Sequence, residues 1–259
     1  MEGLRVGRFD LGLSSSCIVY RLASTVIDTG PPNQWRVVRR FLRERTVERA
    51  LITHHHEDHS GNGARLGSEL QAAVYMPQRG RDYLRSGFPL RAYQRIIWGT
   101  PARFLPDPVP DEVECGDGFR IRAVEAPGHS PDMTCYLEPN RGWLFTGDLY
   151  ISSKPRFLRV DEDVDDYIAS LHTILGLEFE MLFCAHRGVI QDGRRAIRAK
   201  LDYLESLRGE VRRLHEAGYP VGAITRTLLG REGFLTFFTA FHFSKRHFVR
   251  ACLASVERG

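Results

Sequence analysis

One run of nine residues constrains the structures that this chain can adopt more than any other part of the sequence. Residues 53–61 read THHHEDHSG, so four imidazoles and two carboxylates occupy six consecutive positions directly after a short apolar strand, ALIT (50–53). Burying so many unpaired polar groups in one turn would cost too much free energy for an ordinary core. A bound cation removes that cost, and imidazole with carboxylate suits zinc, iron or manganese. The run therefore predicts a metal site at a strand end.

The spacing within this run indicates two cations. In an extended or looping segment His54 and His56 point the same way, so their nitrogens can meet one ion. Asp58 and His59 lie far enough along the chain to meet a second ion.

Three later segments also end strands with metal-ligating side chains. His129 follows a Pro-Gly turn in APGHS (126–130), Asp148 ends TGD (146–148), and His186 lies in CAHRG (184–188). Because strand ends on one edge of a sheet gather at a common site, we expect all four segments to converge. Asp28, Ser60 and Ser130 are candidates for fixing the imidazole tautomers.

The order His-x-His-x-Asp-His, Pro-Gly-His-Ser, Gly-Asp and Ala-His-x-Gly, with an upstream Ile-Asp-Thr-Gly strand end, resembles the metallo-β-lactamase superfamily over roughly residues 16–190. The resemblance implies an α/β fold, an αββα sandwich with a two-metal site along one edge. It also implies the ligands: His54, His56 and His129 for one metal, Asp58, His59 and His186 for the other, and Asp148 bridging both. The last motif departs from the common Pro-Gly-His-Gly.

The C-terminal part of the chain differs in charge from the rest. Residues 194–259 hold 13 Lys/Arg and 6 Asp/Glu, a formal +7, whereas residues 1–193 have a formal −3. We expect a catalytic domain over 1–193 and a small helical domain over 194–259, which resembles a winged-helix-like module. Its basic surface keeps RNA as an alternative partner.

Two regions carry further expectations about packing. Residues 87–112 contain five prolines and predict a long loop or lid over the site, whereas everything beyond Gly193 is expected to be helical. Phe234, Phe237, Phe238 and Phe241 repeat at helical spacing. Such a stripe is typical of a helix core or a homodimer contact, and the alternatives are a base-stacking platform or an apolar wall of the substrate pocket.

The chemistry that the metals imply is hydrolysis. Two Zn²⁺ ions, with iron or manganese as alternatives, would acidify a water to metal-bound hydroxide and polarise the scissile group. Asp58 would orient that hydroxide, and the Tyr150 hydroxyl would stabilise an oxyanion. We expect a small ester, lactone or thioester as substrate. The alternatives are a lactamase-like endoribonuclease or phosphodiesterase and a mononuclear iron sulfur dioxygenase.

The remaining composition favours a cytoplasmic protein that does not enter a membrane. Five widely spaced cysteines form no Cys-x-x-Cys pair and are expected to be reduced, buried thiols. The sequence has no apolar stretch of signal-peptide or transmembrane length.

Overall fold

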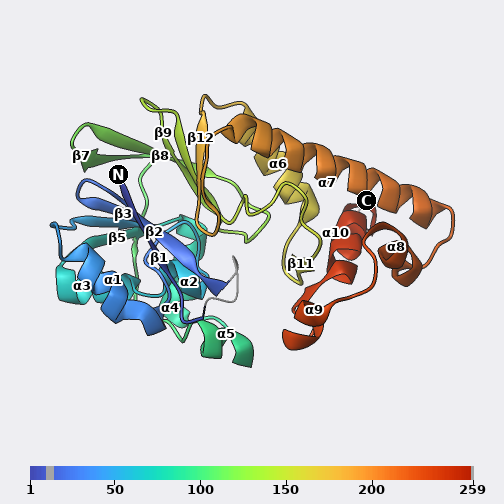
Figure 1. Cartoon of the computed structure of the whole chain (residues 1–259), viewed down its shortest axis with the longest axis horizontal. Coiled ribbons are helices and arrows are strands. Elements are labelled where there is room, and N and C mark those ends of the chain that lie inside the picture. The colour runs from blue at the N-terminus through green and yellow to red at the C-terminus, as the bar shows by residue number, and fades with distance from the viewer. Residues whose placement is uncertain (10–14, 258–259) are drawn as a thin grey trace.

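The chain folds into two six-stranded sheets with helices on their outer faces, followed by a C-terminal group of helices (Figure 1). The computed structural model describes residues 1–9 and 15–257. The first sheet has the order β1 (Glu2–Val6), β2 (Cys17–Leu22), β3 (Thr25–Ile27), β4 (Arg49–Leu51), β5 (Ala73–Met76) and β6 (Asp107–Pro108). The second has the order β13 (Gly188–Ile190), β12 (Met181–Cys184), β10 (Trp143–Gly147), β9 (Thr134–Glu138), β8 (Phe119–Glu125) and β7 (Glu112–Gly116).

Three apolar clusters define the layers. Trp35, Val38 and Leu42 of α1 (Trp35–Leu42), with Leu66 of α3 (Gly63–Leu70), pack on the outer face of the first sheet. A second cluster, which includes Tyr20 and Phe145, fills the space between the sheets. A third joins the second sheet to α6 (Val164–Leu175) and α7 (Gly193–Glu216). The layers therefore run α, β, β, α, which confirms the expected sandwich.

The third cluster extends into the C-terminal helices. The apolar stripe of α7, from Ile197 to Val211, is buried as its spacing predicts. The same cluster takes in Ile224 of α8 (Val221–Leu228) and Phe248 of α10 (Lys245–Glu257). The C-terminal helices thus share one core with the sandwich, and a division at residue 193 stays a prediction.

Residues 87–112 are not one long loop. They contain α5 (Ala92–Ile97) and β6, which adds a parallel strand beside β5. Tyr93, Ile97 and Trp98 form a small apolar cluster of their own, against which Phe243 packs. This packing stabilises regular structure in the segment, which its five prolines had led us to predict as a loop. The helices α2 (Glu57–Ser60) and α4 (Arg81–Ser86) complete the N-terminal half.

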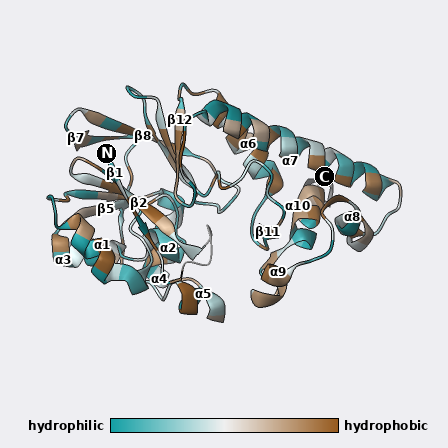
Figure 2. Ribbon diagram, in the orientation of Figure 1, coloured by the Kyte–Doolittle hydropathy of each residue, from teal (hydrophilic) through white to brown (hydrophobic). Residues whose placement is uncertain are grey.

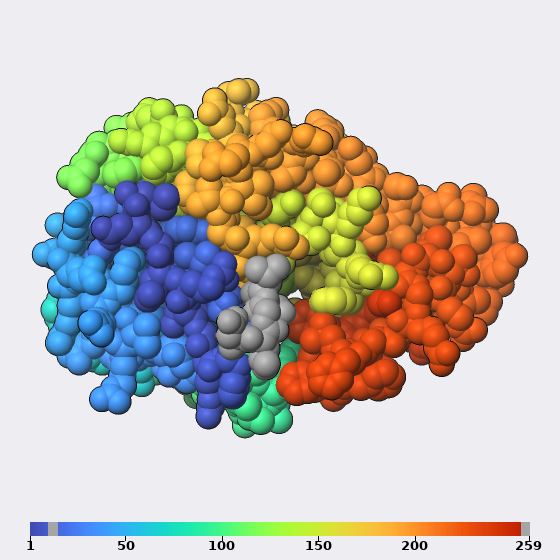
Figure 3. Space-filling view, viewed as in Figure 1, coloured from blue at the N-terminus to red at the C-terminus, as the bar shows by residue number. Residues whose placement is uncertain are grey.

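The expectation of helices alone beyond Gly193 is wrong at one place. β14 (Phe243–Ser244) pairs antiparallel with β11 (Leu158–Arg159) in a separate two-stranded sheet. Figure 3 shows the yellow segment that carries β11 touching the red C-terminal group. Backbone pairing therefore ties the C-terminal part to the segment after Asp148.

The phenylalanine stripe is not a helix core. The helix α9 (Phe234–Phe238) is short, because Ala240 and Phe241 adopt positive φ angles of 49° and 61°. All four stripe residues are exposed, Phe234 by 80%. The ribbon of α9 is coloured mainly as hydrophobic in Figure 2. The structure holds one chain, so a homodimer contact stays a prediction.

Glu232 fastens the N-terminus of α10 to the rest of the C-terminal group. Its carboxylate accepts hydrogen bonds from the Ser244 and Thr236 hydroxyls and from the backbone N–H groups of Lys245 and Arg246. Partial burial raises the pKa of Glu232, but these hydrogen bonds outweigh burial and lower the pKa to about 2.

Replacing Glu232 by glutamine should therefore destabilise the protein in a pH-dependent way. At pH 7 we expect a loss of about 1–2 kcal/mol in the free energy of unfolding, since water screens part of the interaction. A carboxyl with a depressed pKa stabilises the fold above its unfolded pKa, near 4.5. The difference between the two proteins should therefore shrink as pH falls from about 4.5 towards 2. Urea unfolding at several pH values measures it, and a constant difference would contradict the role of the charge.

All five cysteines are buried and free, as the sequence predicts. None of the described helices combines the length and the apolar character that crossing a bilayer requires.

Candidate metal centre

The predicted ligands come together because five strand ends meet at one edge of the sandwich. Asp28 follows β3, the His54–His59 segment follows β4, and His129 follows β8. Asp148 and His186 come directly after β10 and β12, which lie parallel and adjacent. The convergence expected from the sequence is thus a property of the sheet topology.

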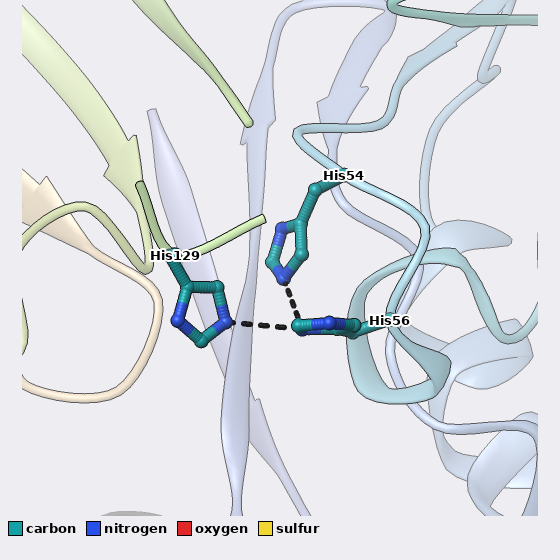
Figure 4. Close-up of side chains that lie close together, drawn as sticks. All are labelled: His54, His56 and His129. Carbon is teal, nitrogen blue, oxygen red and sulfur yellow. Dashed lines mark hydrogen bonds between the residues drawn. The ribbon is translucent and has the colours of Figure 1, made fainter. Parts of the chain in front are cut away.

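The first group contains three imidazoles that point toward one another (Figure 4). The Nδ1 atom of His56 lies 2.8 Å from Nε2 of His54 and 3.0 Å from Nε2 of His129. Burial lowers the pKa of both His54 and His56 well below the usual value. At this spacing the three imidazoles can offer three lone pairs to one cation.

The second group consists of Asp58, His59 and His186. The Oδ2 atom of Asp58 lies 3.8 Å from Nε2 of His59 and 3.7 Å from Nε2 of His186. Burial lowers the pKa of His186, but the carboxylates of Asp148 and Asp58 outweigh it and raise the pKa to about 9. A cation that binds here must displace a proton.

The Asp148 carboxylate lies between the two groups. Its Oδ2 atom is 3.4 Å from Nε2 of His129, while its Oδ1 atom is 3.4 Å from Nε2 of His59 and 3.1 Å from Nε2 of His186. Burial raises the pKa of Asp148, but His186 and His59 outweigh it and hold the pKa well below its usual range. An ionised carboxylate in this position suits a bridge between two cations.

The tautomers of the surrounding histidines fit metal binding. His129 donates from Nδ1 to Glu162 Oε1 at 2.6 Å, His59 to Asp28 Oδ2 at 2.7 Å, and His186 to the Ser16 carbonyl at 2.7 Å. Each Nε2 therefore faces the site, where it offers its lone pair to a cation once any proton on it has been displaced. Among the described residues, His59 Nε2 and Asp148 Oδ1 are buried and make no well-aligned hydrogen bond, although they lie 3.4 Å apart. Cations would satisfy both atoms.

Of the three expected orienting residues, only Asp28 contacts a donor imidazole. The Ser60 hydroxyl donates to the backbone carbonyls of His55 and His56, and the Ser130 hydroxyl interacts with Asp132. Sequence reasoning missed Glu162, which lies 33 positions from His129 and forms no motif with it. The fourth histidine, His55, pairs with Asp132 and stacks on Tyr83, away from the donor groups.

Exchanging Asp28 for asparagine should weaken cation binding at the second group. Asparagine tolerates the positive φ of 60° at this position but removes the charge that holds His59 Nδ1–H. We expect zinc affinity there to fall about 10–100-fold, with the first group unaffected. A chromophoric chelator competition measures both affinities. Asp132→Asn is the matched control, because its imidazole partner His55 is no donor; an equal loss in both variants would refute the orienting role.

A cavity of about 310 Å³ opens onto these donors. Tyr93 and Trp98 wall it from the α5 region, Phe243 from β14, and Leu204 from α7, so both the 87–112 segment and the C-terminal part line it as expected. Asp58, Asp148, His56, His129 and His186 lie on its surface. Tyr150 is packed in the third apolar cluster and is absent from the cavity lining, so the structure gives its predicted oxyanion role no support.

The fold and the site together define an αββα protein with a donor set for two cations at one edge of its sheets. The model of the metallo-beta-lactamase superfamily matches residues 11–186, and the chain belongs to this superfamily. The resemblance stated from its motifs is thereby confirmed.

Curated relatives with known names are thioesterases and lactamase-like proteins. The atrochrysone carboxyl ACP thioesterase of Aspergillus fumigatus is 26% identical over 60% of this chain, and thioesterase pkgB of Emericella nidulans is 29% identical over 64%. Each alignment covers 43% of the relative, so the match spans less than half of those proteins.

Two solved structures share the fold over almost the whole chain. A beta-lactamase domain protein from Burkholderia ambifaria superposes with a TM-score of 0.71 at 16% identity, covering 98% of this chain and 86% of that one. A metallo-beta-lactamase family protein from Thermus thermophilus gives 0.69 at 19% identity, covering 99% and 93%. Their fold therefore extends through the C-terminal helices.

Proposed function

We propose that this chain is a binuclear, zinc-dependent hydrolase of small acyl substrates, with thioesters as the foremost class. The observation that carries the proposal is the Asp148 carboxylate, which lies within 3.4 Å of nitrogens from both donor groups and faces the cavity. The thioesterase names of the curated relatives support the choice of bond.

The chain's own residues would divide the work at the site. His54, His56 and His129 would hold one cation, Asp58, His59 and His186 the other, with Asp148 shared. When bound, the cations would acidify a water molecule and polarise the acyl carbonyl. Asp58, which lies on the cavity surface, would orient the attacking water through its carboxylate.

The cavity walls favour an acyl group over a nucleic acid. Tyr93, Trp98, Leu204 and Phe243 offer aromatic and aliphatic surface, which suits a small apolar acyl chain. Several basic side chains of the C-terminal part are already paired, among them Arg208 with Asp165 and Arg213 with Glu210. We therefore propose a small-molecule substrate. RNA binding and a cytoplasmic location stay predictions.

Metal analysis followed by a substrate panel tests the proposal. We expect two zinc ions per purified chain, and hydrolysis of acyl thioesters or aryl esters that a chelator abolishes and added zinc restores. The panel includes a lactone, bis(p-nitrophenyl) phosphate and an RNA oligonucleotide. One iron per chain with oxygen consumption on a persulfide would favour a sulfur dioxygenase, and salt-sensitive cleavage of the oligonucleotide alone would favour an endoribonuclease. Either result would overturn the proposal.

A further inference from the structure

Arg159 is a buried cation inside the cavity that no motif in the sequence predicts. It ends β11, lines the cavity beside His56, and exposes 11% of its side chain. Two of its nitrogens are occupied: Nε lies 3.1 Å from Oδ1 of Asp161, and NH2 lies 3.0 Å from Oδ2. The third nitrogen, NH1, lies 3.2 Å from Nδ1 of His56.

The position of NH1 needs explaining, because His56 Nδ1 belongs to the first donor group. The same atom lies 2.8 Å from His54 Nε2 and 3.0 Å from His129 Nε2. A guanidinium has no lone pair and keeps its proton, so it cannot be a ligand. Once a cation takes the histidine lone pair, NH1 loses this acceptor and faces a like charge, which is unfavourable in a buried site. An anionic oxygen that lies between the guanidinium and the bound metal ion removes this repulsion.

The guanidinium is also held in place. The Asp161 carboxylate grips it at two nitrogens, the backbone N–H of Arg159 donates to Glu162 Oε2 at 2.7 Å, and β11 is fixed by its pairing with β14. Glu162 in turn accepts from His129, so one carboxylate sets both the arginine and a donor imidazole. A donor fixed beforehand stabilises developing charge without reorganisation.

We propose that Arg159 is a catalytic residue, which donates a hydrogen bond from NH1 to the acyl oxygen that becomes negatively charged during hydrolysis. This inference rests on the proposed acyl hydrolase function. As the water oxygen bonds to the acyl carbon, the carbonyl π pair moves onto the acyl oxygen, which accepts from NH1. When the C–S bond breaks, that pair re-forms the C=O bond, and the leaving sulfur takes the proton that water lost. Arg159 keeps its own protons throughout.

Kinetics and a binding measurement together test this role. Arg159→Gln should lower kcat for the best thioester about 10²–10³-fold, as the loss of one oxyanion donor does, while KM changes little. Arg159→Lys should recover part of that loss, since lysine keeps the positive charge but lacks the paired N–H groups of the guanidinium. Benzylphosphonate, whose anionic oxygens imitate the charged acyl oxygen, should bind zinc-loaded Arg159→Gln at least about tenfold more weakly by calorimetry, the loss expected for one charge-assisted hydrogen bond.

Controls separate this role from a structural one. Arg208→Gln breaks another arginine–aspartate pair, outside the cavity lining, and should leave kcat and phosphonate affinity unchanged. Zinc content and melting temperature should stay near wild-type values in Arg159→Gln. If that variant fails to fold, Asp161→Asn releases the guanidinium without removing it and should lower kcat and phosphonate affinity in the same direction.

The inference is overturned if folded, zinc-loaded Arg159→Gln retains wild-type kcat and phosphonate affinity. A wild-type protein that hydrolyses no thioester or ester would instead refute the proposed function. The phosphonate titration would still report whether Arg159 binds an anion at this site.

Discussion

Replacing Asp148 by asparagine is expected to reduce bound zinc from the proposed two ions per chain to at most one and to abolish the proposed hydrolysis. The Asp148 carboxylate lies within 3.4 Å of nitrogens from both donor groups, and a neutral amide removes the charge that a bridge requires. Because cation chemistry contributes several kcal/mol to lowering the barrier, we expect kcat/KM to fall at least about a thousandfold. Elemental analysis and initial rates measure the two effects.

Asp117→Asn is the control for the loss of an aspartate charge. Asp117 lies exposed in the turn between β7 and β8, where asparagine tolerates its φ of 50°. Its zinc content and rate should match wild type. If Asp148→Asn kept two zinc ions and full activity, the assignment of Asp148 as the shared residue would be wrong.

Exchanging Gly128 for alanine should cost much of the stability of the fold. Gly128 has a φ of +136°, and a Cβ built there would lie 2.7 Å from the backbone nitrogen of Tyr167 and 2.8 Å from its Cα. Backbone at the start of α6 cannot move aside cheaply, so strain and overpacking add up. We expect a loss of at least about 3 kcal/mol in the free energy of unfolding, together with weaker zinc binding at His129.

Gly209→Ala provides the matched comparison. Gly209 lies inside α7, where a Cβ would meet nothing within 4 Å. Alanine there should raise the free energy of unfolding by about 0.5–1 kcal/mol. Urea unfolding of both variants measures the contrast. Similar stabilities would contradict the prediction, because they would show that the Tyr167 backbone moves to make room for the added methyl group.

The donor residues were predictable because local sequence encodes them. Each one follows an apolar strand, and the parallel pairing of β10 with β12 brings Asp148 and His186 together. Their outer partners were harder to predict. Glu162 reaches His129 and Arg159 reaches His56 across 33 and 103 positions, and only tertiary packing makes those contacts. Asp28 was found because it ends a strand at the same edge.

Two C-terminal expectations failed for a different reason: the phenylalanine stripe is no helix core, and β14 interrupts the helices. The spacing of Phe234, Phe237 and Phe238 is helical, and that part does form α9. Periodicity shows neither where a helix stops nor what covers it, and the positive φ angles at Ala240 and Phe241 end the helix before the stripe is complete. The pairing of β14 with β11 could not be predicted from local sequence, because it joins residues far apart in the chain. Arg159 and its register partner Phe243 are 84 positions apart.

This pairing also joins two parts of the chain that are synthesised at different times. All seven proposed donor residues have been translated once His186 is made. β14, which pairs with the strand that carries Arg159, is translated only with Phe243 and Ser244, more than fifty residues later. The proposed donor set is therefore translated before the strand that anchors Arg159 through its pairing with β11.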